Sequence, residues 1–292
     1  MQETTGILYL CATPIGNLKD MTERVIETLR SVDLIAAEDT RNSMKLLTHF
    51  DIKVPMTSYH EFNKTEKAIY LIDQLKAGKN IALITDAGTP AISDPGQILV
   101  AMCHENNVTV TSLPGACACI TALTLSGFPS RRFAFEGFLP QEKREHKAVL
   151  CSLINETRTV ILYEAPHRLK ETLTDLNKTL GDREIALCRE LTKKFETIDI
   201  TTLSRAVEKY ETEDPRGEYV LVLMGRSPEE LKQEEESRWQ EMSIEEHMKY
   251  YEETGINRKE AMKAVARDRG LSKRDVYQYL LASVKFYSDN GK

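Results

Sequence analysis

The sequence has little that would place the protein in a membrane or outside the cell. No apolar run among its 292 residues reaches membrane-spanning length, and the first residues, Met1 to Thr5, lack the positive and long apolar regions of a secretory signal. The six cysteines are scattered through apolar segments, and Cys117 and Cys119 have the wrong spacing for a CxxC zinc or redox motif. These absences predict a cytoplasmic protein in a reducing compartment.

What is present is the composition of a globular protein, with 41% hydrophobic and 29% charged residues. At this length the chain can bury the cores of roughly two domains and carry a small third module. The net charge of −6 gives the whole chain little nonspecific attraction to nucleic acid. Any contact with a nucleic acid must therefore come from local basic patches.

Apolar strand patterns alternate with amphipathic helical patterns from Gly6 to Met224, which is typical of two α/β halves. The turn Pro114-Gly115 is the candidate seam between the halves. The predicted strands are Ile7–Cys11, Leu34–Ala37, Ile81–Ile84, Val108–Thr111, Phe133–Phe138, Thr159–Tyr163, Ile185–Cys188 and Tyr219–Met224. The predicted helices are Thr22–Leu29, Arg41–His49, Glu66–Leu75, Gln97–His104, one from Pro114-Gly115 through Leu125, one from Gln141 onward, and His167–Leu180.

The stretch Leu83–Gly96 is the most informative, because a buried strand breaks there into a loop rich in aspartate, glycine and proline. Open parallel sheets bind ligands at the carboxyl ends of their strands, so this loop is a predicted ligand site. Gly88 and Gly96 let backbone amides approach a ligand closely, and Asp86 offers a carboxylate to hydroxyl groups or an amine. A rigid structural turn is the alternative interpretation.

Two motifs follow the first two predicted strands. Ala12–Leu18 has one glycine where a dinucleotide-binding loop has three, so a Rossmann fingerprint is rejected. Glu38-Asp39-Thr40-Arg41 places two carboxylates beside an arginine at the start of a helix. Capping by Asp39 or Thr40 is one interpretation, and a catalytic or substrate-binding role for Glu38 or Arg41 is the other.

Three further loops carry polar groups, and two of them also carry aromatic side chains. Tyr59–Asn63 would suit either the stacking of a base or the ordering of a lid. Tyr163–Arg168 opens a helix with a proline, a geometry that aims backbone donors and Arg168 at a cleft. Arg189–Lys194 likewise places charged and polar residues directly after a predicted strand.

The charge pattern reverses within the last quarter of the chain. Glutamate dominates from Ser227 to Gly255, which marks a solvated linker or an exposed helix. Lysine and arginine dominate from Asn257, where Gly270 separates two apolar faces and Ser272 can cap the second one. The faces consist of Ala261, Ala264 and Val265, and of Val276, Tyr279 and Leu280. This helix-turn-helix pattern serves either as a nucleic-acid contact or as a plain helical hairpin.

Taken together, seven segments resemble the bacterial small-subunit ribosomal RNA (cytidine-2′-O)-methyltransferases, a family of the tetrapyrrole methylase superfamily. Their order and spacing agree over nearly the whole chain, and the basic C-terminal module resembles the helix-turn-helix appendage of that family. Members that act on tetrapyrroles usually have a glycine-rich first loop, so Thr13–Asn17 resembles the RNA-modifying branch instead. The segments are Ala12–Leu18, Ala37–Arg41, Leu83–Gly96, Leu113–Ala116, Phe135–Pro140, Tyr163–Arg168 and Arg189–Lys193.

The resemblance implies two α/β domains of tetrapyrrole methylase type with a cofactor cleft between them, followed by a small helical, helix-turn-helix-like module. We place the N-terminal α/β domain at residues 1–114, the C-terminal α/β domain at 115–226, the acidic linker or helix at 227–256 and the basic module at 257–292. It further implies a homodimer that uses S-adenosylmethionine to methylate the ribose 2′-hydroxyl of a cytidine in the decoding region of small-subunit ribosomal RNA.

The same resemblance transfers roles to individual residues. The cofactor contacts it implies are Pro14, Asp86, Ala87, Gly88, Ala91, Cys117, Ala118, Tyr163, Leu191 and Gly217. The first candidate for a general base is Glu38, with Glu190 and His60 as alternates, because each follows a strand or lies in a loop expected to face the cleft. The candidate phosphate contacts are Arg41, Arg131, Arg132, Lys143, Arg144 and Arg168. In-line transfer of a methyl group to a hydroxyl requires no metal.

Three other functions stay open at this point. A tetrapyrrole C-methyltransferase, or another small-substrate methyltransferase of the superfamily, would have the cleft but no use for the basic module. A methyltransferase acting on a modified protein histidine would differ in the same way. A non-enzymatic nucleic-acid-binding regulator would use the module and leave the cleft empty.

Overall fold

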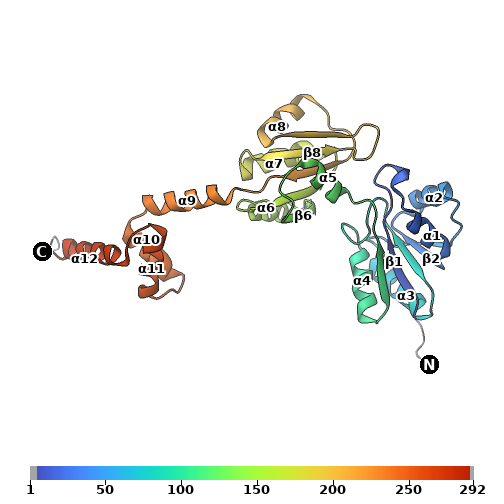
Figure 1. Ribbon diagram of the computed structural model, residues 1–292, viewed down its shortest axis with the longest axis horizontal. Coiled ribbons are helices and arrows are strands. Elements are labelled where there is room, and N and C mark those ends of the chain that lie inside the picture. The colour runs from blue at the N-terminus through green and yellow to red at the C-terminus, as the bar shows by residue number, and fades with distance from the viewer. Residues whose placement is uncertain (1–4, 290–292) are drawn as a thin grey trace. The chain divides into compact units, whose positions relative to one another are not determined.

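The computed structural model describes residues 5–289 and contains two compact units, one ending at Gly225 and the other beginning at Arg226 (Figure 1). Within the described range, the first unit holds two five-stranded sheets and the second is helical. No helix of residues 5–289 has both the length and the apolar character needed to cross a membrane.

The first sheet is parallel throughout, with strand order β3-β2-β4-β1-β5. Strands β2 and β4 have the apolar sequences LIAA and IALI because helices cover both faces of the sheet, α3 and α4 on one side and α1 and α2 on the other. Its strands are β1 (Ile7–Cys11), β2 (Leu34–Ala37), β3 (Met56–Ser58), β4 (Ile81–Ile84) and β5 (Thr109–Leu113). Its helices are η1 (Leu18–Asp20), α1 (Glu23–Ser31), α2 (Thr40–His49), α3 (Lys64–Lys76) and α4 (Gly96–Glu105).

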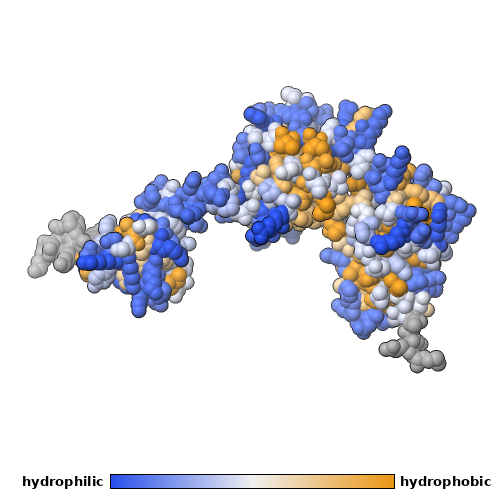
Figure 2. All heavy atoms as spheres, viewed as in Figure 1, coloured by the Kyte–Doolittle hydropathy of each residue, from blue (hydrophilic) through white to orange (hydrophobic). Residues whose placement is uncertain are grey.

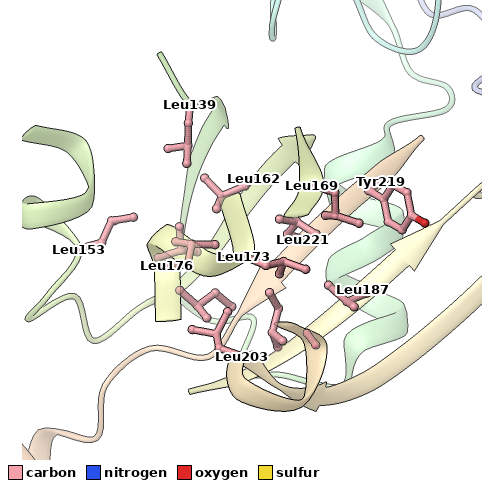
Figure 3. Close-up of a cluster of buried hydrophobic side chains, with 14 of the residues drawn as sticks. Leu139, Leu153, Leu162, Leu169, Leu173, Leu176, Leu187, Leu203, Tyr219 and Leu221 are labelled. Atoms are coloured by element: carbon pink, nitrogen blue, oxygen red, sulfur yellow. The ribbon is translucent and has the colours of Figure 1, made fainter. Parts of the chain in front are cut away.

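The second sheet is mixed, with order β6-β7-β10-β8-β9; only β6 and β7 are parallel. Residues alternate along each strand, so Leu162, Leu187 and Leu221 face the cluster beneath α7 and α8 (Figure 3). The opposite face packs on α5. The strands are β6 (Phe133–Phe138), β7 (Thr159–Glu164), β8 (Glu184–Arg189), β9 (Thr197–Thr202) and β10 (Tyr219–Leu223). The helices are α5 (Ala118–Ser126), α6 (Lys143–Ser152), α7 (Leu169–Leu180) and α8 (Leu203–Thr212).

The predicted alternation of strands and helices is confirmed, and four predicted strands have the observed bounds. The sequence patterns do not predict β3, β9 or α8. Strand β3 is three residues long, and β9 is a polar edge strand of sequence TIDITT, so neither contains the apolar run that identified the central strands. Capping by Asp39 is confirmed, since its carboxylate accepts a hydrogen bond from the Arg41 amide at the start of α2.

The second unit consists of α9 (Pro228–Glu241), α10 (Ile244–Glu253), α11 (Arg258–Asp268) and α12 (Lys273–Asp289). Helices α11 and α12 form the predicted helical hairpin, with Ala261, Val265 and Val276 buried in its core. Helix α10 belongs to the same core through Ile244 and Met248, so the end of the acidic segment 227–256 is packed and is not a linker. Tyr279 is about half exposed, which corrects its assignment to the apolar face.

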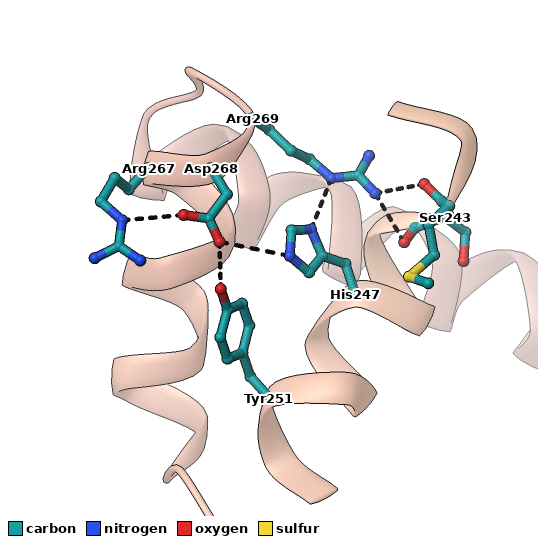
Figure 4. Close-up of polar contacts among 7 residues, drawn as sticks. Ser243, His247, Tyr251, Arg267, Asp268 and Arg269 are labelled. Atoms are coloured by element: carbon teal, nitrogen blue, oxygen red, sulfur yellow. Dashed lines mark hydrogen bonds and ion pairs between the residues drawn. The ribbon is translucent and has the colours of Figure 1, made fainter. Parts of the chain in front are cut away.

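A polar network joins the helices of this second unit (Figure 4). His247 is fully buried and stacks on Trp239, with ring centroids 4.0 Å apart. Its Nδ1 accepts a hydrogen bond of 3.2 Å from Nε of Arg269, and Nη2 of Arg269 donates to the backbone oxygens of Met242 and Ser243. Arg269 is therefore a structural residue of the hairpin.

Candidate functional site

A cavity of about 480 Å³ lies in the α/β unit, at edges of both sheets. Its walls come from the loops that follow β2 and β4 in the first sheet, and from the end of β7, the start of β10 and the segment after β8 in the second. This volume and mixed lining are typical of pockets for small molecules. The carboxyl ends of the parallel strands thus place the cavity where open α/β sheets bind ligands.

The loop after β4 is held in a fixed shape by hydrogen bonds. Thr13 and Gly88 exchange two backbone hydrogen bonds of 2.9 and 3.1 Å, and Gly88 has a φ of +84°. A Cβ at Gly88 would meet the Ile15 side chain at 3.3 Å, so both backbone angle and space favour glycine here. Asp94 closes the loop, because its two carboxylate oxygens accept hydrogen bonds of 2.8 Å from the amides of Ala91 and Gly96.

Two carboxylates stand side by side on the first sheet's part of the cavity wall, Glu38 after β2 and Asp86 after β4. Oε2 of Glu38 accepts hydrogen bonds from the Thr85 hydroxyl and, at 3.3 Å, from the Asp86 amide. Asp86 accepts hydrogen bonds from the Asp39 amide at 3.3 Å and from the Asn42 side chain at 3.2 Å. These hydrogen bonds orient both carboxylates. Among the described residues, neither carboxylate forms an ion pair.

The facing wall is aromatic and apolar. Tyr163 packs edge-on against Phe135 and Phe138, with ring centroids 5.0 and 5.6 Å away, and its hydroxyl accepts a hydrogen bond of 3.2 Å from the Cys119 amide. Burial raises the pKa of Tyr163, so the hydroxyl stays protonated. This wall can cover a flat ring, whereas the carboxylates opposite can hold hydroxyl or ammonium groups.

A pair of thiols lies at the start of α5. The sulfur atoms of Cys117 and Cys119 are 3.4 Å apart, and Cys117 lines the cavity. The Cys119 thiol hydrogen bond, together with backbone amides at the helix start, lowers the pKa of Cys117 to about 6. The pKa of Cys119 is raised by the same bond and by burial.

Most of the residues predicted to bind a cofactor come together at this cavity. Asp86, Ala87, Gly88, Cys117, Ala118, Tyr163 and Leu191 all line it. Pro14, Ala91 and Gly217 do not line the cavity, but a sequence neighbour of each one does. Ile15 lines the wall next to Pro14, Ile92 next to Ala91, and Glu218 next to Gly217. Ala91, with a φ of +67°, belongs instead to the turn that Asp94 fixes.

Gly217 and Glu190 interact with each other and lie outside the wall of the cavity. A Cβ at Gly217 would lie 2.6 Å from the carboxylate carbon of Glu190, so glycine is needed for this close approach. Glu190 accepts hydrogen bonds from the Glu218 amide at 3.0 Å and from Lys193 at 2.9 Å. Although burial opposes the change, hydrogen bonds from Lys193 and the Glu218 amide lower the pKa of Glu190. These bonds make it a poor proton acceptor.

The third candidate base, His60, does not line the cavity either. It lies in the loop after β3, where its amide donates a 2.8 Å hydrogen bond to the side chain of Asn63. Of the three candidates, only Glu38 lines the cavity.

The predicted phosphate contacts separate into free and structural cations. Arg131, Arg132, Lys143 and Arg144 are exposed. Arg41 is also exposed but forms a bidentate pair with Asp39, at 3.1 and 2.7 Å. Arg168 is largely buried: it donates to the Leu139 carbonyl at 3.0 Å and lies 3.8 Å from the buried carboxylate of Glu164. Its engagement with Leu139 and Glu164 at the start of α7 argues against an RNA contact.

The sequence patterns missed Ser93, Asp94, Glu164 and Glu218, which all contribute to the cavity wall. Asp94 could have been found from the spacing Ala91–Asp94–Gly96, because an aspartate that accepts from nearby amides is a common loop signal. Burial raises the pKa of Asp94. Within the described part of the chain, no cluster of three or more histidine, cysteine, aspartate or glutamate side chains could hold a metal ion.

Comparison with known proteins gives these features a context. A family model described as tetrapyrrole (corrin/porphyrin) methylases matches residues 7–207. The Synechocystis sp. protein named ribosomal RNA small subunit methyltransferase I is 48% identical over 277 residues, covering 94% of this chain and 98% of the relative. The Bacillus subtilis protein of that name is 49% identical over 272 residues, with 93% of each chain covered.

Solved structures share the fold at much lower sequence identity. A diphthine synthase superposes with a TM-score of 0.58 at 14% identity, covering 75% of this chain and 90% of its own. A Thermus thermophilus uroporphyrin-III C-methyltransferase, solved with S-adenosylhomocysteine bound, superposes with a TM-score of 0.53 at 17% identity and covers 74% and 97%. At such identities the likeness concerns the fold alone.

Proposed function

Because the chain belongs to the tetrapyrrole methylase family, we propose that it is an S-adenosylmethionine-dependent methyltransferase that modifies the RNA of the small ribosomal subunit. The observation that carries the proposal is the 48% identity to a ribosomal RNA small subunit methyltransferase I over 94% of this chain and 98% of the relative. Identity spread over both α/β halves and beyond favours a shared substrate over a tetrapyrrole substrate, which the lower-identity structural neighbours would suggest.

The cavity fits the proposed cofactor in volume and in chemistry. S-adenosylmethionine combines a charged amino acid end with a ribose and a flat base, and when bound it supplies a methyl group on a positively charged sulfur. Asp86 and the turn at Gly88 are the groups suited to hold its polar parts. Tyr163 and Leu191 offer an aromatic and an apolar surface to the base.

Glu38 is the proposed general base for the ribose hydroxyl of the substrate. Both of its described hydrogen bonds use Oε2, which leaves Oε1 to accept the hydroxyl proton. The Thr85 hydroxyl and the Asp86 amide hold the carboxylate at the cavity wall, so little reorientation is needed during proton transfer. The proposed target follows from the family resemblance: the 2′-hydroxyl of a cytidine in the decoding region.

We propose that the RNA lies across the exposed cations Arg131, Arg132, Lys143, Arg144 and Arg41, which would contact phosphates and position the substrate. We propose a homodimer as the active form. Hydrophobic side chains gather around α5 on one face of the α/β unit (Figure 2), where Ile120 and Leu125 are 45% and 42% exposed. Ribosomal subunits assemble in the cytoplasm, so we expect the enzyme there.

The decisive experiment incubates the full chain with methyl-labelled S-adenosylmethionine and three acceptors: small ribosomal subunits, a short RNA carrying the target cytidine, and a tetrapyrrole. We expect label on one cytidine ribose of the subunit, identified by nuclease digestion and mass spectrometry. Label on the tetrapyrrole alone would establish the alternative function. Equal labelling of the short RNA and the particle would show that the assembled subunit is not required.

A further inference from the structure

The loop Tyr59–Asn63 presents a bare aromatic side chain at the edge of the first sheet. Phe62 is 97% exposed, the largest value for a bulky apolar side chain among the described residues. Burying a phenylalanine side chain stabilises a fold, and this fold forgoes that contribution at Phe62. The ring is therefore available to a ligand.

Hydrogen bonds hold the residues at both ends of the loop that carries Phe62. At its start, the buried Tyr59 donates a hydrogen bond of 3.0 Å to the Pro95 carbonyl. At its end, the Asn63 side chain accepts from the His60 amide at 2.8 Å and donates to the Ser58 hydroxyl at 3.1 Å. These bonds fix both ends of a short turn and leave its apex outside.

The same bonds tie the loop to the cavity wall. The Tyr59 amide donates a 2.8 Å hydrogen bond to the Ala37 carbonyl, and the next residue, Glu38, lines the cavity. Pro95, which accepts from the Tyr59 hydroxyl, directly follows Asp94 of the same wall. The aromatic side chain therefore lies on the sheet edge that carries the proposed general base.

We propose that Phe62 is a stacking platform for an unpaired base of the RNA substrate, at or beside the nucleotide whose ribose is methylated. This inference rests on the proposed function. A base offers a flat ring that one aromatic side chain can cover, and stacking on aromatic residues is the usual way in which proteins hold unpaired RNA. The His60 ring packs edge-on against the Phe62 ring, with ring centroids 6.1 Å apart.

The surroundings favour a base over a protein partner. Phe62 is flanked by Glu61 and by Lys64, which form an ion pair, so the apolar surface at this apex is one ring wide. Protein interfaces instead bury aromatic anchors in the centre of larger apolar patches.

The test compares Phe62→Ala, Phe62→Leu and Phe62→Trp in the full chain. We measure the affinity for small ribosomal subunits, single-turnover methyl transfer to them, and S-adenosylmethionine binding by calorimetry. The Ala and Leu variants should each bind the subunit about 5- to 150-fold more weakly than the wild type, and the Trp variant should retain wild-type binding. Cofactor binding should not change in any of them. Tyr70→Ala is the matched control, because this exposed ring on α3 is already covered by the Lys67 ammonium, 4.8 Å from its centroid.

Normal subunit binding by Phe62→Ala would overturn the inference. Normal subunit binding by Phe62→Leu would overturn it as well, since then no aromatic ring is needed. The failure of the proposed function looks different: the wild-type chain itself would not methylate the subunit, whatever stands at position 62.

Discussion

The two units use their polar side chains in opposite ways. In the α/β unit, Glu38 and Asp86 stand at the ends of strands and face a cavity. In the helical unit, Asp268 pairs with Arg267 and accepts a hydrogen bond from Tyr251, while Arg269 donates one to His247, so these groups are paired with one another. Polar groups that face open space are available to a ligand, whereas mutually paired groups stabilise a fold. Substitutions of these particular groups should therefore impair chemistry in the first unit and stability in the second.

The largest effect on methyl transfer is expected from a substitution of the proposed general base, Glu38. Glu38→Gln keeps the shape and the bond from Thr85 but cannot take a proton, so methyl transfer should fall about 10²- to 10⁴-fold. Single-turnover assays measure this, with calorimetry to show that the cofactor still binds. Glu190→Gln is the matched control and should lose little, because Lys193 and the Glu218 amide already occupy that carboxylate. Comparable losses in both variants would remove Glu38 from its role.

The next effect concerns cofactor affinity. Asp86→Ala should weaken S-adenosylmethionine binding about 10- to 150-fold, the equivalent of about 1.5 to 3 kcal/mol for one charge-assisted hydrogen bond. Asp86→Asn keeps one side-chain oxygen, which can still accept the hydrogen bond from the Asp39 amide, so it separates loss of charge from loss of the whole side chain. Titration calorimetry on both variants, with thermal unfolding as a check of folding, decides the matter. Near-normal affinity in the folded Ala variant would exclude Asp86 from the site.

The thiol that lines the cavity should respond to pH. With a pKa of about 6, Cys117 is mostly thiolate at neutral pH, so its alkylation rate should fall about tenfold between pH 7 and pH 5. S-adenosylmethionine should protect it, because Cys117 forms part of the wall. Mass spectrometry of peptides after timed iodoacetamide labelling measures both effects, and Cys117→Ser identifies the peptide. A labelling rate that does not change when S-adenosylmethionine is added would show that Cys117 lies outside the cofactor-binding site.

The helical unit should contribute RNA affinity through its surface charge only. Replacing the surface cations Arg258, Lys259, Lys273 and Arg274 with alanine should lower RNA affinity about tenfold and reduce its salt slope by about 0.7 to 0.9 for each phosphate that the protein no longer neutralises. Arg267 and Arg269 are unsuitable for this test, since both are engaged within the unit. Lys232→Ala on the acidic helix α9 is the control. An unchanged slope would make the unit a stability or dimerisation element.

The smallest effect is a pH dependence of the helical unit. Burial, and next the Arg269 charge, lower the pKa of His247, while Asp268 opposes them. In the unfolded state His247 binds a proton below about pH 6.5, whereas in the folded state it binds one only at lower pH. The stability that is present above about pH 6.5 is therefore lost as the pH falls. Trp239, the single tryptophan of the chain, stacks on His247, and its fluorescence reports the unfolding of this unit. His247→Phe should flatten the decline; an equal decline in the variant would assign it to other groups.

The sequence predicted the parts of the site that depend on strand order. Glu38 and Asp86 each follow a continuous apolar strand, and β2 and β4 are parallel neighbours, so their ends meet by topology. It could not predict where side chains point within loops. Glu190 also follows a strand, yet a φ of +53° turns its carboxylate toward Gly217 and Lys193. Likewise, Arg269 has the sequence context of a surface cation and is held inside the hairpin by bonds to distant residues.

The shared cavity wall also has a consequence for the order in which the protein becomes functional during synthesis. Its first residue in the chain is Ile15 and its last is Val220. Domains fold from the N-terminus as the chain emerges, so the first sheet can be complete while the wall contributed by β10 is still inside the translating ribosome. The first half must consequently fold without help from a bound ligand. A cofactor can stabilise the nascent protein only after about three quarters of it has been made.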